Sequence, residues 1–387
     1  YMAWEKYQKE LPPIWVIDDA GNTINGGPET KPLSPEEEIA YRITDNKLNE
    51  SEWIMEMVIG DLKVISLELV DLTGFDSNLI LETKEDKPDL SIVAGKPRTQ
   101  LGDIYELGRH KIICGDSTDP ETYKKLLGDE RPRLVFTDPP YSIDYQSTAG
   151  LPDRFTGKKK KQYSYNSDKF GGSDGRIFND DKTPEEALDF YKKILKCIYD
   201  FTTDDMTLYW WYANRLTHIN MQAQSESGFH FSQIVIWLKN SLIFSPGQLF
   251  HRIYEPCIVS WKEGKTHFQN HTFSAFTELW NLDQKTFAEN LDIIYQKRDN
   301  TNAYIHPTQK PVQLAERALK RSSEKGDIVL DAFGGSGSTM MACEQLDRSA
   351  RLIELDPKFV DAIIGRYVKY KEDPIIRKNG EETTWII

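Results

Sequence analysis

The residues best suited to chemistry in this chain are Asp138, Pro139, Pro140 and Tyr141, which follow the apolar run 134–136. The run predicts a buried strand that delivers a carboxylate, two rigid rings and an aromatic side chain to one point. A carboxylate accepts hydrogen bonds from an amine, and prolines lack N–H groups, so nearby carbonyls are free to accept from a ligand. Because the aromatic ring can also stack on a flat heterocycle, the stretch predicts a holder for a planar amine such as a flipped nucleobase. The alternative is a proline turn after a core strand.

A second stretch favours the amine holder over the simple turn. Residues 328–331 form an apolar strand that runs into a glycine-rich turn at 332–339, and a helix is expected over 340–346. Glycines let the backbone approach a ligand closely, and a helix N-terminus offers free N–H groups. The turn lacks the Gly-x-x-x-x-Gly-Lys-Ser/Thr pattern, which disfavours triphosphate binding. About eighteen residues on, the strand 351–356 ends in acids, a spacing that suits a carboxylate on ribose hydroxyls.

In this order, the two stretches resemble those of a β-class, S-adenosylmethionine-dependent, amino-group DNA methyltransferase, in which the amine motif precedes the cofactor motif. Residues 102–119 and the HPTQKP motif at 306–311 resemble further motifs of that family, and the resemblance covers about Gly102 to Lys371. It implies an α/β fold with a Rossmann-like, doubly wound, mainly parallel sheet that is circularly permuted. It also implies S-adenosylmethionine as the cofactor, double-stranded DNA as the partner and adenine N6 as the atom that is methylated.

The resemblance also implies roles for individual residues. Asp138 and the carbonyl of Pro139 would accept the amine N–H groups, and Tyr141 would stack on the extruded base. Asp116 would meet the adenine amine of the cofactor and Glu354 its ribose. The other residues expected to bind the cofactor lie in the glycine-rich turn and the HPTQKP motif: Asp331, Phe333, Gly334, Gly335, Ser336, Gly337, Ser338, Thr308 and Lys310.

The expected reaction is direct methyl transfer without a metal or a covalent enzyme intermediate, because a sulfonium methyl group is already activated and the protein need only position and polarise the amine. Milder interpretations of the same residues remain open. Asp116 could cap a helix, Glu354 could be an exposed acid, and Lys310 could pair with Asp331 or Asp356.

Two other functions are alternatives to adenine methylation. Cytosine N4 is chemically similar, but family members of that kind more often carry Ser where this chain has Asp138, which favours adenine. The second is a DNA-binding adaptor with an inactive methyltransferase domain, which the intact motifs disfavour.

The net charge of −13 is unevenly distributed. Residues 1–90 hold 20 acids and 8 bases, whereas the remaining residues hold 41 acids and 40 bases. The basic stretch at 151–176, which includes Arg154, Lys158, Lys159, Lys160 and Lys161, follows the amine motif directly. It predicts a loop (146–178) that binds the DNA backbone beside the flipped base, or else a solvated surface loop.

The domain organisation is expected to be a small module, a linker and the enzyme. Residues 1–82 are acidic and mostly helical and resemble part of the ParB-like module that prophage methyltransferases carry. Within them, Ser34, Pro35 and Glu37 predict a capped helix start, and a helical stretch is expected to run to about Leu72. Residues 83–101 predict a polar linker, 102–373 the methyltransferase domain and 374–387 a tail.

Between the two motifs, strand and helix signals alternate as a doubly wound sheet requires. The pattern predicts helices over 184–201, capped by Thr183, and over 215–227, with strands at 207–212, 231–238 and 257–261. The aromatic run 209–212 is better explained as a core strand than as a base-stacking platform. Residues 263–304 are expected to recognise the target sequence or to form a structural insertion.

The remaining composition excludes other classes of protein. The four cysteines are widely spaced without a C-x-x-C pair, which predicts buried thiols in a reducing compartment rather than zinc ligands. The histidines show no paired spacing, so no metal is expected. No long apolar run or signal-peptide pattern occurs, which predicts a cytoplasmic enzyme of DNA modification with no membrane partner. Members of the β class often form dimers, so a homodimer is a further expectation.

Overall fold

The computed structural model of the chain divides it into two units, 1–80 and 81–387. The described residues are 34–48, 55–66, 69–70, 73, 82–84, 96–142, 182–243, 249–270, 292–296, 309–371 and 374–385.

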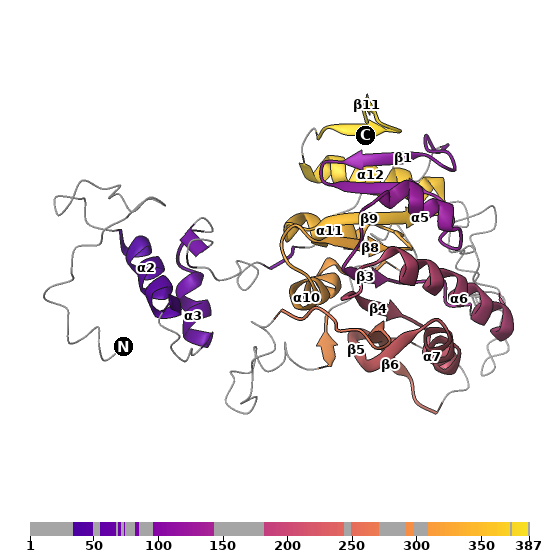
Figure 1. The fold of residues 1–387 in the computed structure, drawn as a ribbon, viewed down its shortest axis with the longest axis horizontal. Coiled ribbons are helices and arrows are strands. Elements are labelled where there is room, and N and C mark those ends of the chain that lie inside the picture. The colour runs from indigo at the N-terminus through magenta and orange to yellow at the C-terminus, as the bar shows by residue number, and fades with distance from the viewer. Residues whose placement is uncertain are drawn as a thin grey trace, which may run out of the picture. The chain divides into compact units, whose positions relative to one another are not determined.

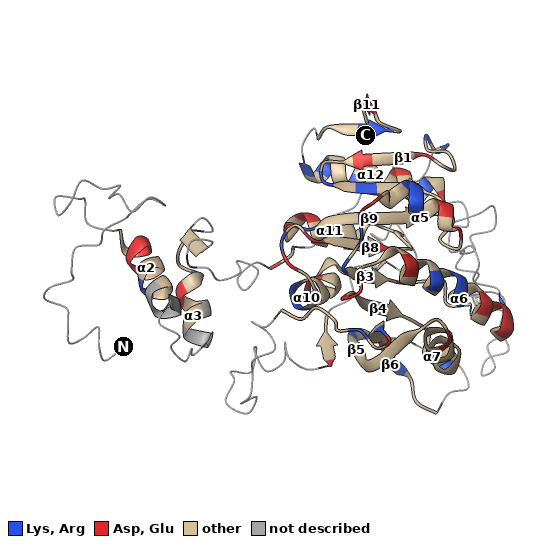
Figure 2. Cartoon of the chain, viewed as in Figure 1, with Lys and Arg blue, Asp and Glu red and all other residues tan. Residues whose placement is uncertain are grey.

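Within its described residues, the first unit contains the helices α2 (Pro35–Leu48) and α3 (Met55–Leu62). The predicted capping box at the start of α2 is confirmed. The Ser34 N–H donates to Glu37 Oε2 at 2.7 Å, and the Glu37 N–H donates to Ser34 Oγ at 3.2 Å. Three acids in the first turn complement the positive end of the helix dipole (Figure 2). A small apolar core consists of Ala40, Ile43, Val58, Leu62, Ile65 and Val70.

The helical stretch expected to run to about Leu72 is interrupted after Leu62. The Ser66 hydroxyl accepts from the Leu69 N–H at 3.4 Å, and the Val70 N–H donates to the Ser66 carbonyl. Because a serine side chain that binds a backbone N–H favours a new helical start over continuation, the chain breaks there and begins a separate turn.

The second unit is built on one eleven-stranded sheet in the order β11-β10-β1-β2-β9-β8-β3-β4-β6-β5-β7 (Figure 1). Its five central strands, β2-β9-β8-β3-β4, run parallel, whereas the pairings at β1, β10 and β11 and at β6 are antiparallel. The strands are β1 (Ile104–Leu107), β2 (His110–Cys114), β3 (Leu134–Thr137), β4 (Thr207–Trp211), β5 (Phe229–Ile243), β6 (Arg252–Lys262), β7 (Ile293–Tyr295), β8 (Ile328–Asp331), β9 (Ser349–Glu354), β10 (Ile376–Lys378) and β11 (Glu381–Thr383).

Helices cover both faces of this sheet, so that two cores form. On β3, Phe136 packs into the core of one face and Val135 into the other, and on β4 Trp211 and Trp210 divide in the same way. This alternation is the two-residue period of a strand that is buried on both faces. One core includes residues of α10 (Val312–Ser322), α11 (Ser338–Gln345) and α12 (Pro357–Lys371), and the other includes residues of α5 (Pro120–Leu127), α6 (Pro184–Phe201) and α7 (Thr217–Glu226).

The predicted doubly wound α/β fold is confirmed. Helix α6 has the predicted bounds, and Thr183 caps it through a complete capping box. The predicted aromatic strand is β4, whose Trp210 and Trp211 are fully buried. The helix expected over 215–227 begins instead as a 3-10 turn, η3 (Asn214–Leu216), which leads into α7.

The segment predicted as a polar linker, 83–101, falls within the second unit and contacts its helices near both ends of the segment. Thr83 donates to Glu316 of α10 through its N–H and hydroxyl, at 2.8 and 2.6 Å. The N–H groups of Arg98 and Thr99 donate to Asp361 of α12 at 2.6 and 3.1 Å. A free linker would lack such buried or half-buried hydrogen bonds. Here polar side chains of α10 and α12 bind the backbone of the segment.

The four cysteines are buried free thiols, as predicted. Among the helices of the described residues, none is long and apolar enough to cross a bilayer.

The capping box on α6 generates a stability prediction. Thr183→Ala removes the hydroxyl that accepts from the Glu186 N–H, and should lower the free energy of unfolding by about 1 kcal/mol. Urea unfolding followed by circular dichroism would measure the loss. Thr183→Ser keeps an acceptor at the same position and should cost much less; equal losses in the two variants would contradict the capping role.

Candidate active site

The expected site residues come together because the sheet reverses its order between β8 and β3. From β8 the chain continues to the neighbouring β9, whereas from β3 it continues to β4 on the opposite side. Ligands of open α/β sheets bind at the carboxyl ends of the strands at such a switch point. Since β2, β9, β8 and β3 are parallel, the segments that follow them lie along one edge of the sheet. Asp116, the glycine-rich turn and Asp138 follow β2, β8 and β3, and Glu354 is the last residue of β9.

At the end of β3, Asp138 pairs with the ammonium group of Lys310, which precedes α10. Lys310 Nζ lies 2.5 Å from Asp138 Oδ2, 3.2 Å from the Tyr141 hydroxyl and 3.4 Å from Glu255 Oε2 on β6. The same ammonium lies 5.6 Å from the Tyr141 ring centre and 5.3 Å from that of Trp211, within the range of cation–π attraction. Lys310 therefore joins β3, β4 and β6 at one point.

A fourth charge completes this group. Lys239 of β5 is buried and forms an ion pair with Glu255, so two lysines and two acids alternate. Burial alone would raise the pKa of Glu255, but Lys310 and Lys239 outweigh it and lower that pKa to about 2. Burial would likewise lower the pKa of Lys310, but Asp138 and Glu255 reverse the direction and raise it. Both groups are thus held in their charged forms.

Asp138 differs from its neighbours in electrostatics and in hydrogen bonding. Burial raises the pKa of its carboxyl group, and the attraction of Lys310 does not offset this effect. Its Oδ1 atom is buried and has no hydrogen-bond partner among the described residues. A buried acceptor without a donor is costly unless a ligand supplies one. Asp138 therefore offers one oxygen held by Lys310 and a second oxygen for an incoming N–H group.

The motif around Asp138 is fixed by its surroundings. The Tyr191 hydroxyl of α6 donates to the Pro140 carbonyl at 2.8 Å, which leaves the Pro139 carbonyl as the candidate acceptor for a ligand. Thr137, the last residue of β3, donates to Asp331 Oδ1 of β8 at 3.0 Å and so ties the two strands together beside the site.

The glycine-rich turn after β8 is compact. Gly335 and Gly337 have φ values of 53° and 78°, which favour glycine. A Cβ atom on Gly334 would lie 3.2 Å from Ile363 and 3.3 Å from Leu352, which is tighter than ordinary contact. The turn then passes directly into the N-terminus of α11, with Gly337 at the cap position.

Two acids brace this turn, and both have raised pKa values. Asp331 accepts from the hydroxyls of Thr137 and Thr339 and from the Phe333 N–H, and Glu354 accepts from the N–H groups of Gly335 and Asp356. Burial outweighs these hydrogen bonds and raises the pKa of each acid to about 7. Asp331 therefore shapes the turn through these hydrogen bonds.

The turn is also linked to Lys310. The Ser338 hydroxyl donates to the Lys310 carbonyl at 2.6 Å, and the buried Arg366 donates to the Ser336 carbonyl at 2.7 Å. Lys310 pairs with Asp138 and Glu255, not with Asp331 or Asp356 as one interpretation of the sequence had it.

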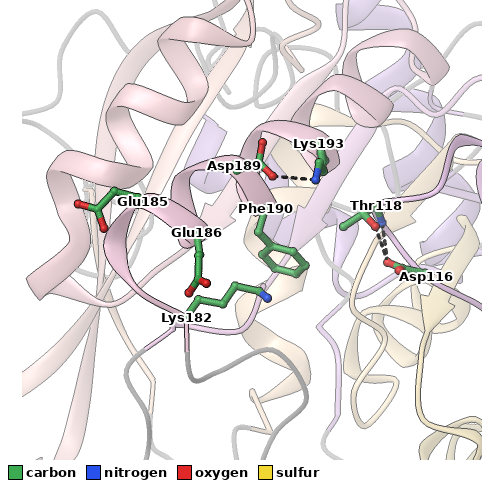
Figure 3. Close-up of a pocket in the computed structure, with 8 residues that line it drawn as sticks. All are labelled: Asp116, Thr118, Lys182, Glu185, Glu186, Asp189, Phe190 and Lys193. Atoms are coloured by element: carbon green, nitrogen blue, oxygen red, sulfur yellow. Dashed lines mark hydrogen bonds and ion pairs between the residues drawn. The ribbon is translucent and has the colours of Figure 1, made fainter.

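Asp116 lies in a cleft of about 540 Å³ between the end of β2 and the start of α6 (Figure 3). Its Oδ1 accepts from the N–H and hydroxyl of Thr118, at 2.8 and 2.9 Å. Phe190 points into the cleft and lies 6.4 Å from the Phe333 ring of the glycine-rich turn, and Lys182 lies 5.0 Å from the Phe190 ring centre. The cleft thus offers one aromatic ring, that of Phe190, and the carboxylate of Asp116, a combination that suits a flat, amine-bearing ring.

Several predicted residues lie outside the described part of the chain. These are Thr308 and the basic residues Arg154, Lys158, Lys159, Lys160 and Lys161, together with most of the region 263–304. Sequence reasoning missed Glu255 and Lys239. Glu255 was indicated only by its position just before the apolar strand 257–261, and no sequence pattern indicated Lys239.

Comparisons with known proteins decide the family. Residues 133–365, more than half of the chain, match the N6 and N4 methyltransferase family described as DNA methylase. The chain belongs to this family. The type II methyltransferase M.HinfI of Haemophilus influenzae is 25% identical over 283 residues, which cover 68% of this chain and 69% of that protein.

Two further similarities to known proteins are weaker: one covers a short segment, and the other has low sequence identity. The type II methyltransferase M.HpaI of Haemophilus parainfluenzae is 45% identical over 62 residues, so that this chain spans only 20% of its length. The crystallised PvuII DNA methyltransferase, described as cytosine-N4-specific, is 16% identical, with a TM-score of 0.47 over 67% of this chain and 90% of that one.

The charge group at Asp138 generates a prediction on pH. At pH 7, Glu255→Gln should lower the free energy of unfolding by about 3 kcal/mol, because it leaves two buried lysines with one acid. The pKa of Glu255 in the fold, about 2, lies below its usual 4.5. Its stabilisation is therefore complete above about pH 4.5 and is lost as the pH falls toward 2.

Urea unfolding of both proteins at pH 7 and at about pH 3.5 tests this prediction, and the difference should shrink at the lower pH. Glu263→Gln is a matched control on an exposed acid that follows the same strand, and should change stability by less than about 0.5 kcal/mol. A pH-independent difference would argue against an ionised Glu255.

Proposed function

We propose that this protein transfers the methyl group of S-adenosylmethionine to the N6 amine of adenine in DNA. The observation that carries the proposal is the free, buried Oδ1 of Asp138 beside the ring of Tyr141, at the same sheet edge as the glycine-rich turn. Membership of the N6 and N4 family supports transfer to an exocyclic amine of DNA. The finer assignment to adenine rests on Asp138 itself, since cytosine-N4 members more often carry serine there.

The residues present fit S-adenosylmethionine. The backbone of Phe333–Gly337 and the carboxylate of Glu354 would hold the methionine half and the ribose, and Asp116 with Phe190 would hold the adenine ring. The two Glu354 oxygens already accept from backbone N–H groups, but a carboxylate has further lone pairs for ribose hydroxyls. When bound, this cofactor supplies a methyl group that needs no further activation.

The protein's own part is to make the amine a better nucleophile. An amine on a nucleobase is weakly nucleophilic because its lone pair is delocalised into the ring. Hydrogen bonds from the amine to Asp138 Oδ1 and to the Pro139 carbonyl would favour a localised lone pair. Because burial raises the pKa of Asp138, its carboxylate binds an N–H group, or the proton that the amine loses, more strongly than an exposed aspartate would.

Lys310 and Tyr141 position the parts of this reaction. Lys310 holds Asp138 Oδ2, so the free oxygen has one orientation, and Glu255 keeps Lys310 charged. Tyr141, whose hydroxyl accepts from Lys310, would stack its ring on the extruded base, which contributes roughly 1–3 kcal/mol in comparable contacts. The basic loop at 146–178, the region 263–304, the ParB-like module and the homodimer stay predictions.

The central test is the identity of the methylated base. Purified protein, S-adenosylmethionine and unmethylated genomic DNA should yield N6-methyladenine, detected by nucleoside mass spectrometry. Asp138→Ala should remove the product, because the amine loses its acceptor, while the Kd for S-adenosylmethionine measured by titration calorimetry stays within about threefold.

Asp129→Ala, which changes an exposed aspartate after α5, is the control and should retain activity. Detection of N4-methylcytosine in place of N6-methyladenine would refute the adenine assignment. Methylation that survives in Asp138→Ala would refute the role of its carboxylate.

The cofactor site has a separate test. Asp116→Ala should raise the Kd for S-adenosylmethionine roughly tenfold, since it removes one hydrogen bond to a charged acceptor in the cleft. Titration calorimetry without DNA measures this change, and Asp129→Ala again provides the comparison. Equal Kd values for wild type and Asp116→Ala would contradict cofactor binding by Asp116. Its role would then be limited to the hydrogen bonds with Thr118.

A further inference from the structure

A pair of exposed apolar side chains immediately precedes β6. Leu249 is 96% and Phe250 85% exposed, whereas Cys257 and Ile258 later in the same segment are fully buried. Exposure of two adjacent large apolar residues is costly in water, and such a patch commonly marks a surface that a partner covers.

The two side chains line a cleft with an unusual charge balance. The cleft has a volume of about 390 Å³, and its lining residues are Asn214, Arg215, Leu249, Phe250, Arg252 and Tyr254. It contains two arginines and no acid, although the whole chain carries a net charge of −13. The cleft at Asp116, by contrast, is lined by four acids and two lysines.

Neither arginine of this cleft is neutralised by another described residue. Within the described residues, Arg215 and Arg252 form no ion pair, and the buried Nε of Arg252 has no hydrogen-bond partner. Arg133, Arg351 and Arg366 in the same unit all bind acids or carbonyls. Unpaired guanidinium groups beside apolar side chains fit an anionic partner that also presents stacked rings, as a DNA duplex does.

The cleft lies at the edge of the sheet that carries Asp138. β4 runs parallel to β3, so Asn214 and Arg215 follow its carboxyl end as Asp138 follows that of β3. β6 is antiparallel to β4, and its first residues therefore reach the same edge. Glu255 contacts Lys310, and Phe250 precedes Glu255 by five residues, which is at most about 17 Å along an extended chain.

We propose that this cleft binds the DNA duplex beside the extruded adenine. Phe250 enters the space that the base leaves in the stack, and Arg215 and Arg252 bind the flanking phosphates. Apolar side chains inserted between bases stabilise unstacked DNA, and phosphate contacts fix its register. The proposal rests on the proposed DNA methyltransferase function and extends it to the residues that open the duplex.

A second copy of the chain is the competing occupant of the patch. In the commonest, two-fold type of dimer, the same patch would be part of both surfaces, so the unpaired arginines of the two copies would gather at one interface. That arrangement brings like charges together, whereas phosphates neutralise them, and the charge balance therefore favours DNA.

The test separates base extrusion from general binding. The methylated site is first mapped by sequencing genomic DNA treated with wild-type enzyme. Phe250→Ala should then lower kcat/KM roughly tenfold or more on a fully paired duplex with this site. The loss should fall to within about threefold on the same duplex with an abasic position opposite the target, because that base is already unpaired.

Ile375→Ala is the matched control, since Ile375 is 65% exposed and precedes β10 on the opposite flank of the sheet. An equal loss for Phe250→Ala on both duplexes would overturn the insertion. A change of oligomeric state in Phe250→Ala, measured by light scattering, would assign the patch to a second copy instead.

The arginines are tested through the salt dependence of binding. Arg252→Gln should reduce the slope of log Kd against log salt by about one on any duplex, because one phosphate contact is lost. Arg377→Gln on β10 is the control. An unchanged slope for both Arg215→Gln and Arg252→Gln would overturn the cleft as a DNA site. This readout needs no methylation, so it can fail independently of the proposed function, which fails if wild-type enzyme methylates no DNA.

Discussion

The ammonium group of Lys310, buried between Asp138 and Glu255, is the interaction on which the rest of the site depends. It neutralises two acids that would otherwise repel each other, Asp138 at the carboxyl end of β3 and Glu255 on β6, and it orients one of them. Through the Ser338 hydroxyl, its own carbonyl is tied to the glycine-rich turn. The motif at Asp138 and the glycine-rich turn are thus held in one arrangement by a single residue, Lys310, which lies between the described strands and helices.

The alternation of charge explains why Asp138 can stay a strong acceptor in a buried place. An isolated buried carboxylate would take up a proton, whereas a neighbouring ammonium group favours its charged form and leaves further lone pairs to be satisfied. Because Lys310 also serves Glu255, and Lys239 serves Glu255 from the other side, Lys310 binds only one oxygen of Asp138. The second oxygen keeps its capacity for a donor from outside the protein.

The sequence predicted those parts of the structure that depend on neighbouring residues. The strand before Asp138, the glycine-rich turn and the cap at Thr183 follow from local patterns, and parallel strands then bring their ends to one edge. Glu255 and Lys239 could not be predicted, because their partners are set by the register of β5, β6 and β4. Successive residues of a strand point to opposite faces, so a slip of one residue in β6 would put Tyr254 in the place of Glu255. No pattern in the sequence fixes that register by itself.

The same register also determines what β6 presents to the two faces of the sheet. Glu255 and Cys257 point toward the face of α10, where Lys310 lies, whereas Tyr254 and Arg252 line the cleft together with Asn214 and Arg215, which follow β4. One strand, β6, therefore supplies an acid to the charge group around Asp138 and an arginine to the surface beside it. With the proposed DNA site, a chain of large negative net charge would bind a polyanion, because two arginines without an ion pair among the described residues line one cleft. Most of the excess of acids lies in residues 1–90, a separate part of the sequence.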